Sequence, residues 1–387
     1  MTFPFLDRKA DSGLGNIRSS PGDPSRNVDW VLLILQGILT VAGCFVIFSA
    51  SRFQIDGDPY AFVTRQVVFA IIAVVVMVGV MSVDYEWFKE RAAFLYGATV
   101  VLLVLLLLLG IVSGQDRISF DVGPFNVQPA ELAKFTVLLA LCAYLADERD
   151  DEVTYPRFLG GLIMVGVPTV LIILQPDLGS ASVLITIAMG VLLVAGAKPK
   201  YIALITALSF TTVATAFFGG FVNDYQKERL RVFLDQETTD PQLEDAVYQV
   251  RNAIRATGTG GVWGKGWLQG DLTNQRRVPV QWADFPFSAV AEQFGLVGCA
   301  VLLGLFGLTL ARIVRIATLS RDRLGTYLCA GVFSMLLWQV FQNVGMTLGI
   351  MPVTGLPMPF ISYGGSSLIT YFAMFGIIQS VHMRRMR

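Results

Sequence analysis

The chain has 387 residues, of which 54% are hydrophobic and only 15% are charged, and its mean hydropathy is positive. This composition excludes a soluble globular domain and indicates a polytopic membrane protein. The 29 basic and 29 acidic residues cancel, so the net charge identifies no partner and gives no sign of nucleic acid binding.

Ten apolar segments follow a polar N-terminal stretch. Residues 1–29 contain Gly, Pro and Ser without a cleavable signal pattern, and we expect a disordered cytoplasmic tail. Because a bilayer core about 30 Å thick needs roughly 20 apolar residues per helix, we predict an all-α polytopic membrane domain over residues 30–382, with a basic cytoplasmic end at 383–387. Its transmembrane helices, about ten, are expected near residues 31–50, 61–83, 92–113, 128–147, 157–175, 178–195, 200–222, 284–311, 326–350 and 361–382.

Lys and Arg are distributed unequally between the two sets of short loops, and this difference predicts the orientation of the chain. The outer short loops would hold Arg52, Arg65 and Arg117. The inner segments would hold many more basic residues, namely Lys89, Arg91, Arg149, Arg157, Lys198, Lys200, Arg312, Arg315, Arg321, Arg323, Arg384, Arg385 and Arg387. We therefore expect a multi-pass protein of the cytoplasmic membrane with both termini in the cytoplasm.

A long extracytoplasmic loop, residues 223–283, separates the seventh and eighth predicted helices. Its run DPQLE, with Asp240 as N-cap and a proline at the first helical position, predicts an amphipathic helix near 241–256. The glycines of the following TGTGGVWGKGWLQG favour an adaptable loop. The later segment PVTGLPMPFISYGGSS cannot be helical, and we expect a re-entrant or outer loop.

Cysteine and histidine usage excludes several chemistries. Cys44, Cys142, Cys299 and Cys329 are scattered through apolar segments, and His382 is the only histidine. The sequence therefore offers no zinc site and no Cys-His or Ser-His-Asp arrangement. It also lacks a Walker or dinucleotide-binding glycine pattern.

Ionisable residues close to the membrane are the strongest functional signal, because a charge at a helix centre costs about 2.5–3.5 kcal/mol. Glu131 and Lys134, in QPAELAKF, begin the fourth helix at its outer end. Asp177 lies in the tight outer turn between the fifth and sixth helices. A structural alternative exists for each: the first two could neutralise each other on one helix face, and Asp177 could be only an N-cap.

A second acidic group lies where the eighth helix begins, in ADFPFSAVAEQFG. Asp284 opens this helix, and Glu292 follows two turns later on the same face, with Ser288 between them. The predicted topology lets these groups and the earlier ones converge on one outward-facing cavity. Here too there are alternatives, since Asp284 could cap the helix and Glu292 could be a buried support.

Seven motifs follow one another along the chain, namely QPAELAK, LQPDLGSA, RVFLD, YQVRNAI, GGVWGKGW, ADFPFSAVAEQFGLVG and NVGMTLGIMPVTGLPMPFISYGGSS. Together they resemble a known family, the shape, elongation, division and sporulation proteins, which are peptidoglycan polymerases. The resemblance covers residues from about 30 to 382, and GKGW favours the elongation type over the division type.

The sequence departs from the family pattern at a few positions. Val280 and Ala283 replace the usual Glu and Thr before the eighth helix, and Asn126 stands where an Arg is often found. Ile118 follows Arg117 where the family usually has Trp. These changes put neighbouring contacts in doubt, but the aspartate that the family proposes as catalytic is present as Asp284.

The resemblance implies a glycosyltransferase that polymerises lipid II into β-1,4 glycan strands at the outer face of the membrane during cell elongation. Asp284 would be the general base, since an Asp with an unperturbed pKa of about 3.9 is ionised at neutral pH. The diphosphate leaving group needs charge stabilisation, for which Lys134, Arg117, Arg276, Arg277 or a divalent cation such as Mg²⁺ or Mn²⁺ are candidates. Further candidates for the cavity or for substrate binding are Glu131, Asp177, Lys265, Ser288, Glu292 and Ser362.

The family also implies a partner, a class B penicillin-binding protein that crosslinks the new strand, besides the membrane lipid around the helices. Four other functions remain open from the sequence. These are a lipid II flippase, a division-type polymerase, an ion-coupled transporter and a scaffold for wall synthesis. The flippase would use the same cavity and charges, whereas a transporter would favour paired carboxylates at mid-membrane.

Overall fold

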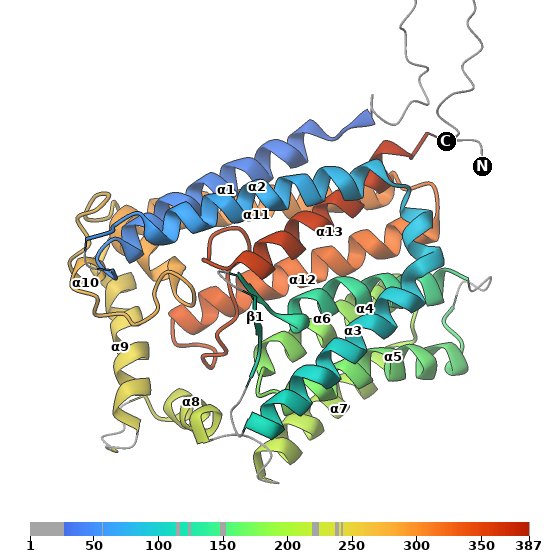
Figure 1. Cartoon of the computed structure of the whole chain (residues 1–387), viewed down its shortest axis with the longest axis horizontal. Coiled ribbons are helices and arrows are strands. Elements are labelled where there is room, and N and C mark those ends of the chain that lie inside the picture. Colours follow the sequence, from blue (N-terminus) through green and yellow to red (C-terminus); the bar gives the residue numbers. More distant parts are fainter. Residues whose placement is uncertain are drawn as a thin grey trace, which may run out of the picture.

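The computed structural model describes residues 27–55, 57–113, 117–122, 125–147, 152–218, 224–236, 240 and 243–386. Ten helices lie at the ten predicted segments (Figure 1), which confirms the all-α polytopic class. They are α1 (Trp30–Ser51), α2 (Ala61–Ser82), α3 (Tyr85–Ser113), α4 (Pro129–Ala146), α5 (Tyr155–Leu174), α6 (Leu178–Val194), α7 (Pro199–Phe218), α11 (Pro286–Thr318), α12 (Arg323–Thr347) and α13 (Gly365–Met383). Residues 1–26 of the predicted tail, Pro241, Arg149 and Arg387 lie outside the described residues.

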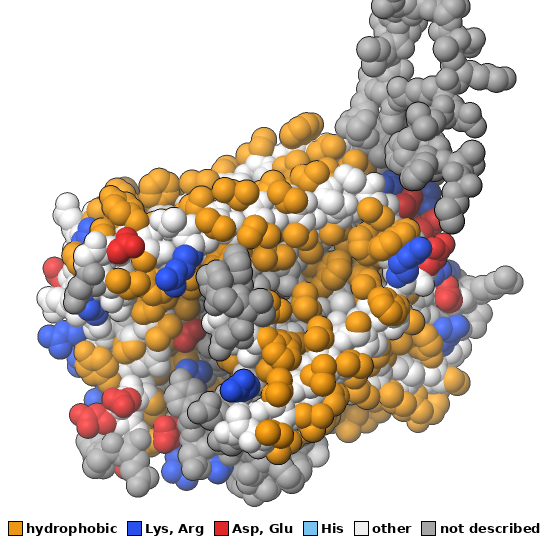
Figure 2. Space-filling view, viewed as in Figure 1, with side chains coloured by type: hydrophobic (Ala, Val, Ile, Leu, Met, Phe, Trp, Pro, Cys, Tyr) orange, Lys and Arg blue, Asp and Glu red, His pale blue; other side chains and the backbone are white. Residues whose placement is uncertain are grey.

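The bundle has the exterior of a membrane protein. Within the described residues, seven helices are long and apolar enough to cross a bilayer, and α6 and the first part of α7 are shorter apolar helices. Helix α13 lies inside the bundle, with almost every side chain buried. Figure 2 shows hydrophobic side chains across the middle of one face, with most charged side chains at its two ends.

Asp29 joins three helices at the end of the bundle where α1 begins. Its carboxylate caps α1 by accepting from the Leu32 N–H at 2.9 Å and also accepts from Arg312 Nε of α11 at 2.7 Å. Gln379 of α13 donates from Nε2 to the Asp29 carbonyl at 2.9 Å. The start of α1 and the end of α13 therefore share one end of the bundle, and α8–α10 lie at the opposite end (Figure 1).

The segment between α12 and α13 is non-helical, as predicted, and it enters the bundle. The backbone turns at Phe360, whose φ of 65° is unusual for a side chain of this size. The Phe360 ring packs on Tyr371 and Phe375 of α13, and its carbonyl lies so near α1 that a Cβ at Gly43 would come within 2.2 Å of the oxygen. Since Gly43 lies in the middle of α1, the segment is re-entrant.

Helix α11 is not the continuous helix predicted over 284–311. Gly295 has φ 64° and ψ −161°, so residues 286–294 and 296–318 form two helices joined at a break. The second part is about 34 Å long at 1.5 Å per residue, enough to cross a core about 30 Å thick by itself. The Ser49 hydroxyl near the outer end of α1 donates to Gln293 Oε1 at 2.7 Å, which places the break at the outer end of the span.

The glycine-rich loop supplies the hydrogen bonds that the broken helix lacks. The N–H groups of Lys265 and Gly266 donate to the carbonyls of Glu292 and Gln293, both at 3.0 Å. The N–H groups of Leu296 and Val297 donate to the carbonyls of Gly261 and Val262 at 2.9 and 3.1 Å. The segment is a loop, as predicted, and its backbone is paired with α11 on both sides of the break.

Four further elements of the outer end differ from the prediction. The amphipathic helix α9 (Glu244–Thr259) begins three residues later than expected, with Leu243 instead of Asp240 at the N-cap. Helices α8 (Asp224–Leu234) and α10 (Asp271–Asn274) were not predicted, nor was the hairpin of β1 (Phe120–Val122) and β2 (Phe125–Val127). Helix α9 packs Val247, Val250 and Ala253 against Val278 and Phe285.

The close approach at the break leads to a stability prediction. A Cβ at Gly264 would lie 2.2 Å from the Gln293 carbonyl oxygen, and its φ of 78° disfavours any other residue. Gly264→Ala should destabilise the protein by about 2 kcal/mol or more, measured as a lower thermal midpoint in detergent. Gly304→Ala is the control. Gly304 lies in the second part of α11, and a Cβ there would have no atom within 4 Å, so this variant should be neutral or more stable. Equal midpoints for the two variants would contradict this account of the break.

Candidate functional site

Asp284 lies in the loop that precedes α11, and α12 fixes its backbone. The Asp284 N–H donates to the Val280 carbonyl at 3.0 Å. Asn343 of α12 donates both of its amide hydrogens, one to the Asp284 carbonyl and one to the Leu356 carbonyl, each at 2.9 Å. Because Asn343 is fully buried, this single amide holds the loop before α11 against the re-entrant segment.

Arg229 of α8 is the basic residue beside Asp284. Arg229 Nη1 donates to the Val353 carbonyl at 3.3 Å. A Cβ on Gly355 would lie 3.6 Å from Arg229 Nη1 and 3.9 Å from Asp284 Oδ1, so the two charged groups flank the same bare stretch of backbone. The φ of Gly355 is 70°, which favours glycine at this position. The site therefore pairs a carboxylate and a guanidinium around an open glycine.

The surroundings change the proton affinity of this carboxylate. The Asp284 side chain is half-buried. Burial raises the pKa of Asp284 above its ordinary value of 3.8, and the positive charge of Arg229 partly opposes the rise. A carboxylate with a raised pKa accepts a proton more readily, so Asp284 is better suited to general base chemistry than an exposed aspartate.

Asp177 is close to the same segment but makes structural contacts. It caps α6 by accepting from the Ser180 N–H at 2.8 Å, and its other oxygen accepts from Gln128 Nε2 at 3.0 Å. A Cβ on Gly179 would come within 3.0 Å of the Thr354 carbonyl, so the start of α6 packs against the re-entrant segment. Asp177 is thus a helix cap that also holds the residue before α4.

Glu131 and Lys134 form a buried ion pair on α4. Lys134 Nζ lies 2.6 Å from Glu131 Oε1, and the two side chains are 0% and 2% exposed. This is the structural pairing that the spacing of three allows. Glu131 Oε2 has no hydrogen-bond partner among the described residues. In a fully buried setting the pair is held by mutual neutralisation, because either charge alone would be expensive.

Ser288 and Glu292 lie in the half-helix that follows Asp284, but both side chains are fully buried and point to other partners. Ser288 donates to the Phe285 carbonyl at 2.7 Å and is fully buried. Glu292, also fully buried, accepts from the N–H and hydroxyl of Thr273 at 3.0 and 2.6 Å and from the Leu272 N–H at 2.8 Å. Glu292 therefore anchors α10, which is the buried support that the sequence left open as an alternative.

The remaining candidates lie around the site without meeting at Asp284. Lys265 Nζ binds Asp271 at 2.7 Å, and that bond raises the pKa of Lys265. Ser362 accepts from the Met358 N–H at 2.8 Å inside the re-entrant segment. Arg117, Arg276 and Arg277 are exposed, and no hydrogen bond or ion pair recorded among the described residues joins them to Asp284.

Sequence reasoning missed Arg229 and Asn343. Arg229 lies in the run KERLR, which leads into RVFLD, and the helical spacing of Leu230, Phe233 and Leu234 among charged residues is the signal of a short amphipathic helix. Asn343 is a polar residue in the apolar segment of α12, and a buried amide in a membrane helix needs partners. Both could have been selected as site residues on those grounds.

The candidate site offers a metal ion one carboxylate ligand, that of Asp284. Within the described residues, no three His, Cys, Asp or Glu side chains gather as a metal site. Asp177 and Glu292 already accept several hydrogen bonds each. The residues present therefore fit a Mg²⁺ only if a ligand such as a diphosphate completes its coordination, which is a common arrangement for this ion.

Several known proteins are similar to this chain along almost its entire length. The Escherichia coli peptidoglycan glycosyltransferase MrdB is 32% identical over 362 residues, covering 93% of this chain and 94% of that protein. A chain of a solved peptidoglycan synthase complex matches with TM-score 0.75 and 30% identity, covering 93% of this chain and 99% of its own. The crystal structure of Thermus thermophilus rod shape determining protein RodA matches with TM-score 0.68 and 28% identity, covering 93% and 98%.

The family model for cell cycle proteins of the FtsW, RodA and SpoVE type matches residues 29–387. Bacillus subtilis stage V sporulation protein E is also similar, with 31% identity over 366 residues that cover 91% of this chain and 96% of that protein. The matched residues include the ten helices at the predicted segments and the loop that carries Asp284. The chain therefore belongs to the FtsW, RodA and SpoVE family, the shape, elongation, division and sporulation proteins.

Proposed function

We propose that this protein is a peptidoglycan glycosyltransferase that polymerises lipid II, with Asp284 as its general base. The observation that carries the proposal is the half-buried Asp284 carboxylate beside Arg229, on a loop fixed by Asn343. Relatives named as peptidoglycan glycosyltransferases support the reaction type. The matches to RodA structures support an elongation role, although FtsW-type relatives are equally similar in sequence.

The reaction needs one base at the site of attack. The 4-hydroxyl of one sugar attacks the anomeric carbon of a second sugar, which carries the lipid diphosphate. As the new C–O bond forms, Asp284 takes the hydroxyl proton, and the bond from the anomeric carbon to the diphosphate oxygen breaks. The diphosphate leaves with the electron pair, so no second carboxyl group is required as an acid. Direct displacement turns an α-linked donor into a β-1,4 linkage.

The leaving diphosphate requires positive charge. Arg229 is the candidate that the geometry favours, because its guanidinium acts electrostatically on Asp284 and both groups lie beside Gly355. Guanidinium groups bind phosphate oxygens in a bidentate manner. Asp284 together with the diphosphate oxygens would be the ligands of a divalent cation, which would neutralise part of the phosphate charge. Lys134, by contrast, is held in its buried pair with Glu131.

The proposed orientation places α8–α10 outside the cell and both termini in the cytoplasm. The end of the bundle where α1 begins carries Lys89, Lys198, Arg312, Arg321 and Arg384. By the positive-inside rule, this end faces the cytoplasm and the protein lies in the cytoplasmic membrane. Asp284 then faces outward, where lipid-linked sugar precursors are polymerised.

A crosslinking partner is part of the proposal. The similar solved chain comes from a peptidoglycan synthase complex that coordinates polymerization and crosslinking. We propose that this protein also works with a class B penicillin-binding protein, which crosslinks the strand that leaves the site.

Replacement of the base is the direct test. Asp284→Asn keeps the size of the side chain but removes the proton acceptor, so glycan synthesis by purified protein, partner and lipid II should fall at least about 100-fold. Glycan products are measured on gels, and the thermal midpoint checks folding. Asp58→Asn, which changes an exposed acid in the α1–α2 loop, is the matched control and should polymerise normally.

Two results would reject the role of Asp284. Normal polymerisation by the Asp284→Asn variant would remove the base from the mechanism. Transfer of lipid II across vesicles without glycan product, unchanged in the variant, would favour a flippase instead.

The pH dependence gives a second test. A general base must be ionised, so the rate should fall as the pH drops through the raised pKa of Asp284. Arg229 favours the ionised form, and Arg229→Gln should therefore move the acid limb of the pH–rate profile to higher pH. Arg65→Gln, an exposed arginine at the outer start of α2, should leave the limb in place. A limb that is unchanged by Arg229→Gln would show that another group sets it.

A further inference from the structure

An aromatic cluster joins the glycine-rich loop to the outer ends of α1 and α2. Trp267, in the run GGVWGKGW, packs edge-to-face on Phe45 of α1 with ring centroids 5.6 Å apart, and its centroid lies 6.3 Å from that of Phe48. Phe48 in turn stacks on Tyr60, the residue before α2, at 5.3 Å. Phe45, Tyr60 and Trp267 nevertheless remain 53%, 59% and 42% exposed. The cluster is therefore packed on one side and open on the other.

The open side of the cluster continues an apolar stripe of α1. Exposed hydrophobic side chains recur along this helix at helical spacing, namely Ile34, Ile38, Val41 and Phe45. The 22 residues of α1 are long and apolar enough to cross a bilayer, so an exposed apolar stripe on this helix faces lipid. Trp267 packs on the last member of the stripe and therefore lies at the edge of the lipid-facing surface.

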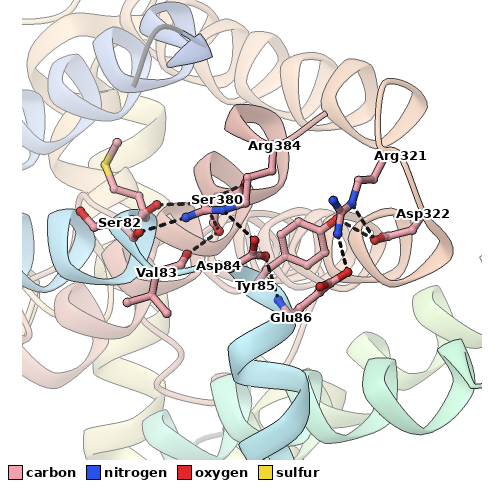
Figure 3. A network of polar contacts seen from close by, with 10 residues as sticks. Ser82, Val83, Asp84, Tyr85, Glu86, Arg321, Asp322, Ser380 and Arg384 are labelled. Carbon is pink, nitrogen blue, oxygen red and sulfur yellow. Dashed lines mark hydrogen bonds and ion pairs between the residues drawn. The ribbon is translucent and has the colours of Figure 1, made fainter. Parts of the chain in front are cut away.

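The depth of the cluster follows from the opposite end of α2. Figure 3 shows Arg384, at the end of α13, beside the last residues of α2. Arg384 donates to the Ser82 carbonyl at 3.0 Å and pairs with Asp84 at 3.1 Å, and such charges mark the polar boundary of a membrane span. From Ser82 the 22 residues of α2 extend about 33 Å at 1.5 Å per residue, close to the core thickness of about 30 Å. Tyr60, and the cluster with it, therefore lies at the other boundary.

Charged neighbours tie the same loop to α10. Arg52, which follows α1, donates from Nη2 to the Leu268 carbonyl at 2.9 Å and to Asn274 Oδ1 of α10 at 2.8 Å. Lys265 Nζ binds Asp271 of α10 at 2.7 Å. The loop thus combines exposed aromatic rings at the lipid boundary with ionic groups bound to an element outside the span. Trp and Tyr are enriched at membrane–water interfaces because their rings suit such mixed surroundings.

We propose that Trp267, with Phe45 and Tyr60, anchors the glycine-rich loop in the membrane leaflet at the α8–α10 end of the bundle. The partner is phospholipid, and the indole ring of Trp267 lies at the level of its ester groups. Residues 261–266, directly before Trp267, pair with both sides of the break in α11. The anchor therefore sets the depth of that break in the bilayer. It rests on the packing of the loop and does not depend on the proposed reaction.

Fluorescence of the full chain in phosphatidylcholine vesicles tests the contact with lipid. The chain has six tryptophans, and Trp267→Phe removes one of them while keeping an aromatic ring. The difference between the unmodified chain and this variant isolates the emission of Trp267. This emission should lose more intensity with lipid brominated near the ester groups than with lipid brominated near the bilayer centre. Iodide in the water should quench it less than the first lipid does.

Hydrogen exchange in the same vesicles tests whether the ring holds the loop. Trp267→Gln replaces the ring with a polar side chain, and exchange of the Lys265 and Gly266 amides should rise about fivefold, the factor expected when aromatic contacts are lost. Trp267→Phe should retain the slow exchange of the unmodified chain. Tyr248→Gln, which replaces an exposed aromatic side chain of α9, is the matched control and should leave exchange in the loop unchanged.

Three results would overturn the anchor. Stronger quenching of Trp267 by iodide than by either brominated lipid would place its ring in water. Quenching by none of the three reagents would place the ring under protein, such as a second copy of the chain. Equal loop exchange in Trp267→Gln and Tyr248→Gln would show that the ring does not hold the loop.

Discussion

A helix that breaks in a membrane protein leaves backbone donors and acceptors where little water can reach them, and this constraint shapes the outer half of the molecule. The break in α11 at Gly295 is satisfied by the backbone of residues 261–266, which pairs with both sides of the gap. The approach is so close that glycine is needed at Gly260 and Gly264 on the loop, as well as at Gly295. The loop and the membrane helix are therefore one unit.

This break gives Asp284 its position. The half-helix 286–294 holds the carboxylate on a loop outside the spanning part of α11, so a charge can be partly buried without crossing lipid. The other acidic side chains nearby are engaged elsewhere: Glu131 with Lys134, Asp177 with Gln128 and the start of α6, and Glu292 with α10. Their bonds stiffen the framework, whereas Asp284 lies beside Arg229 at Gly355.

The sequence allowed the membrane helices to be predicted because length and apolarity alone determine them, and all ten predicted segments are helical. It also identified most of the acidic residues at the outer end, since charges are rare in such segments. It could not reveal the break at Gly295, because a glycine inside an apolar run is compatible with a continuous helix. Nor could it tell that Glu292 points to Thr273 and that Arg229 lies beside Asp284, because both contacts join segments far apart in the chain.

Gly355 has a consequence for any variant of the re-entrant segment. A Cβ on this residue would lie within 4 Å of both Arg229 Nη1 and Asp284 Oδ1, so a side chain here would press on both charged groups. The backbone φ of 70° already disfavours replacement. Crowding and backbone geometry therefore exclude the same substitutions, and glycine at this position serves both the charged pair and the fold of the segment.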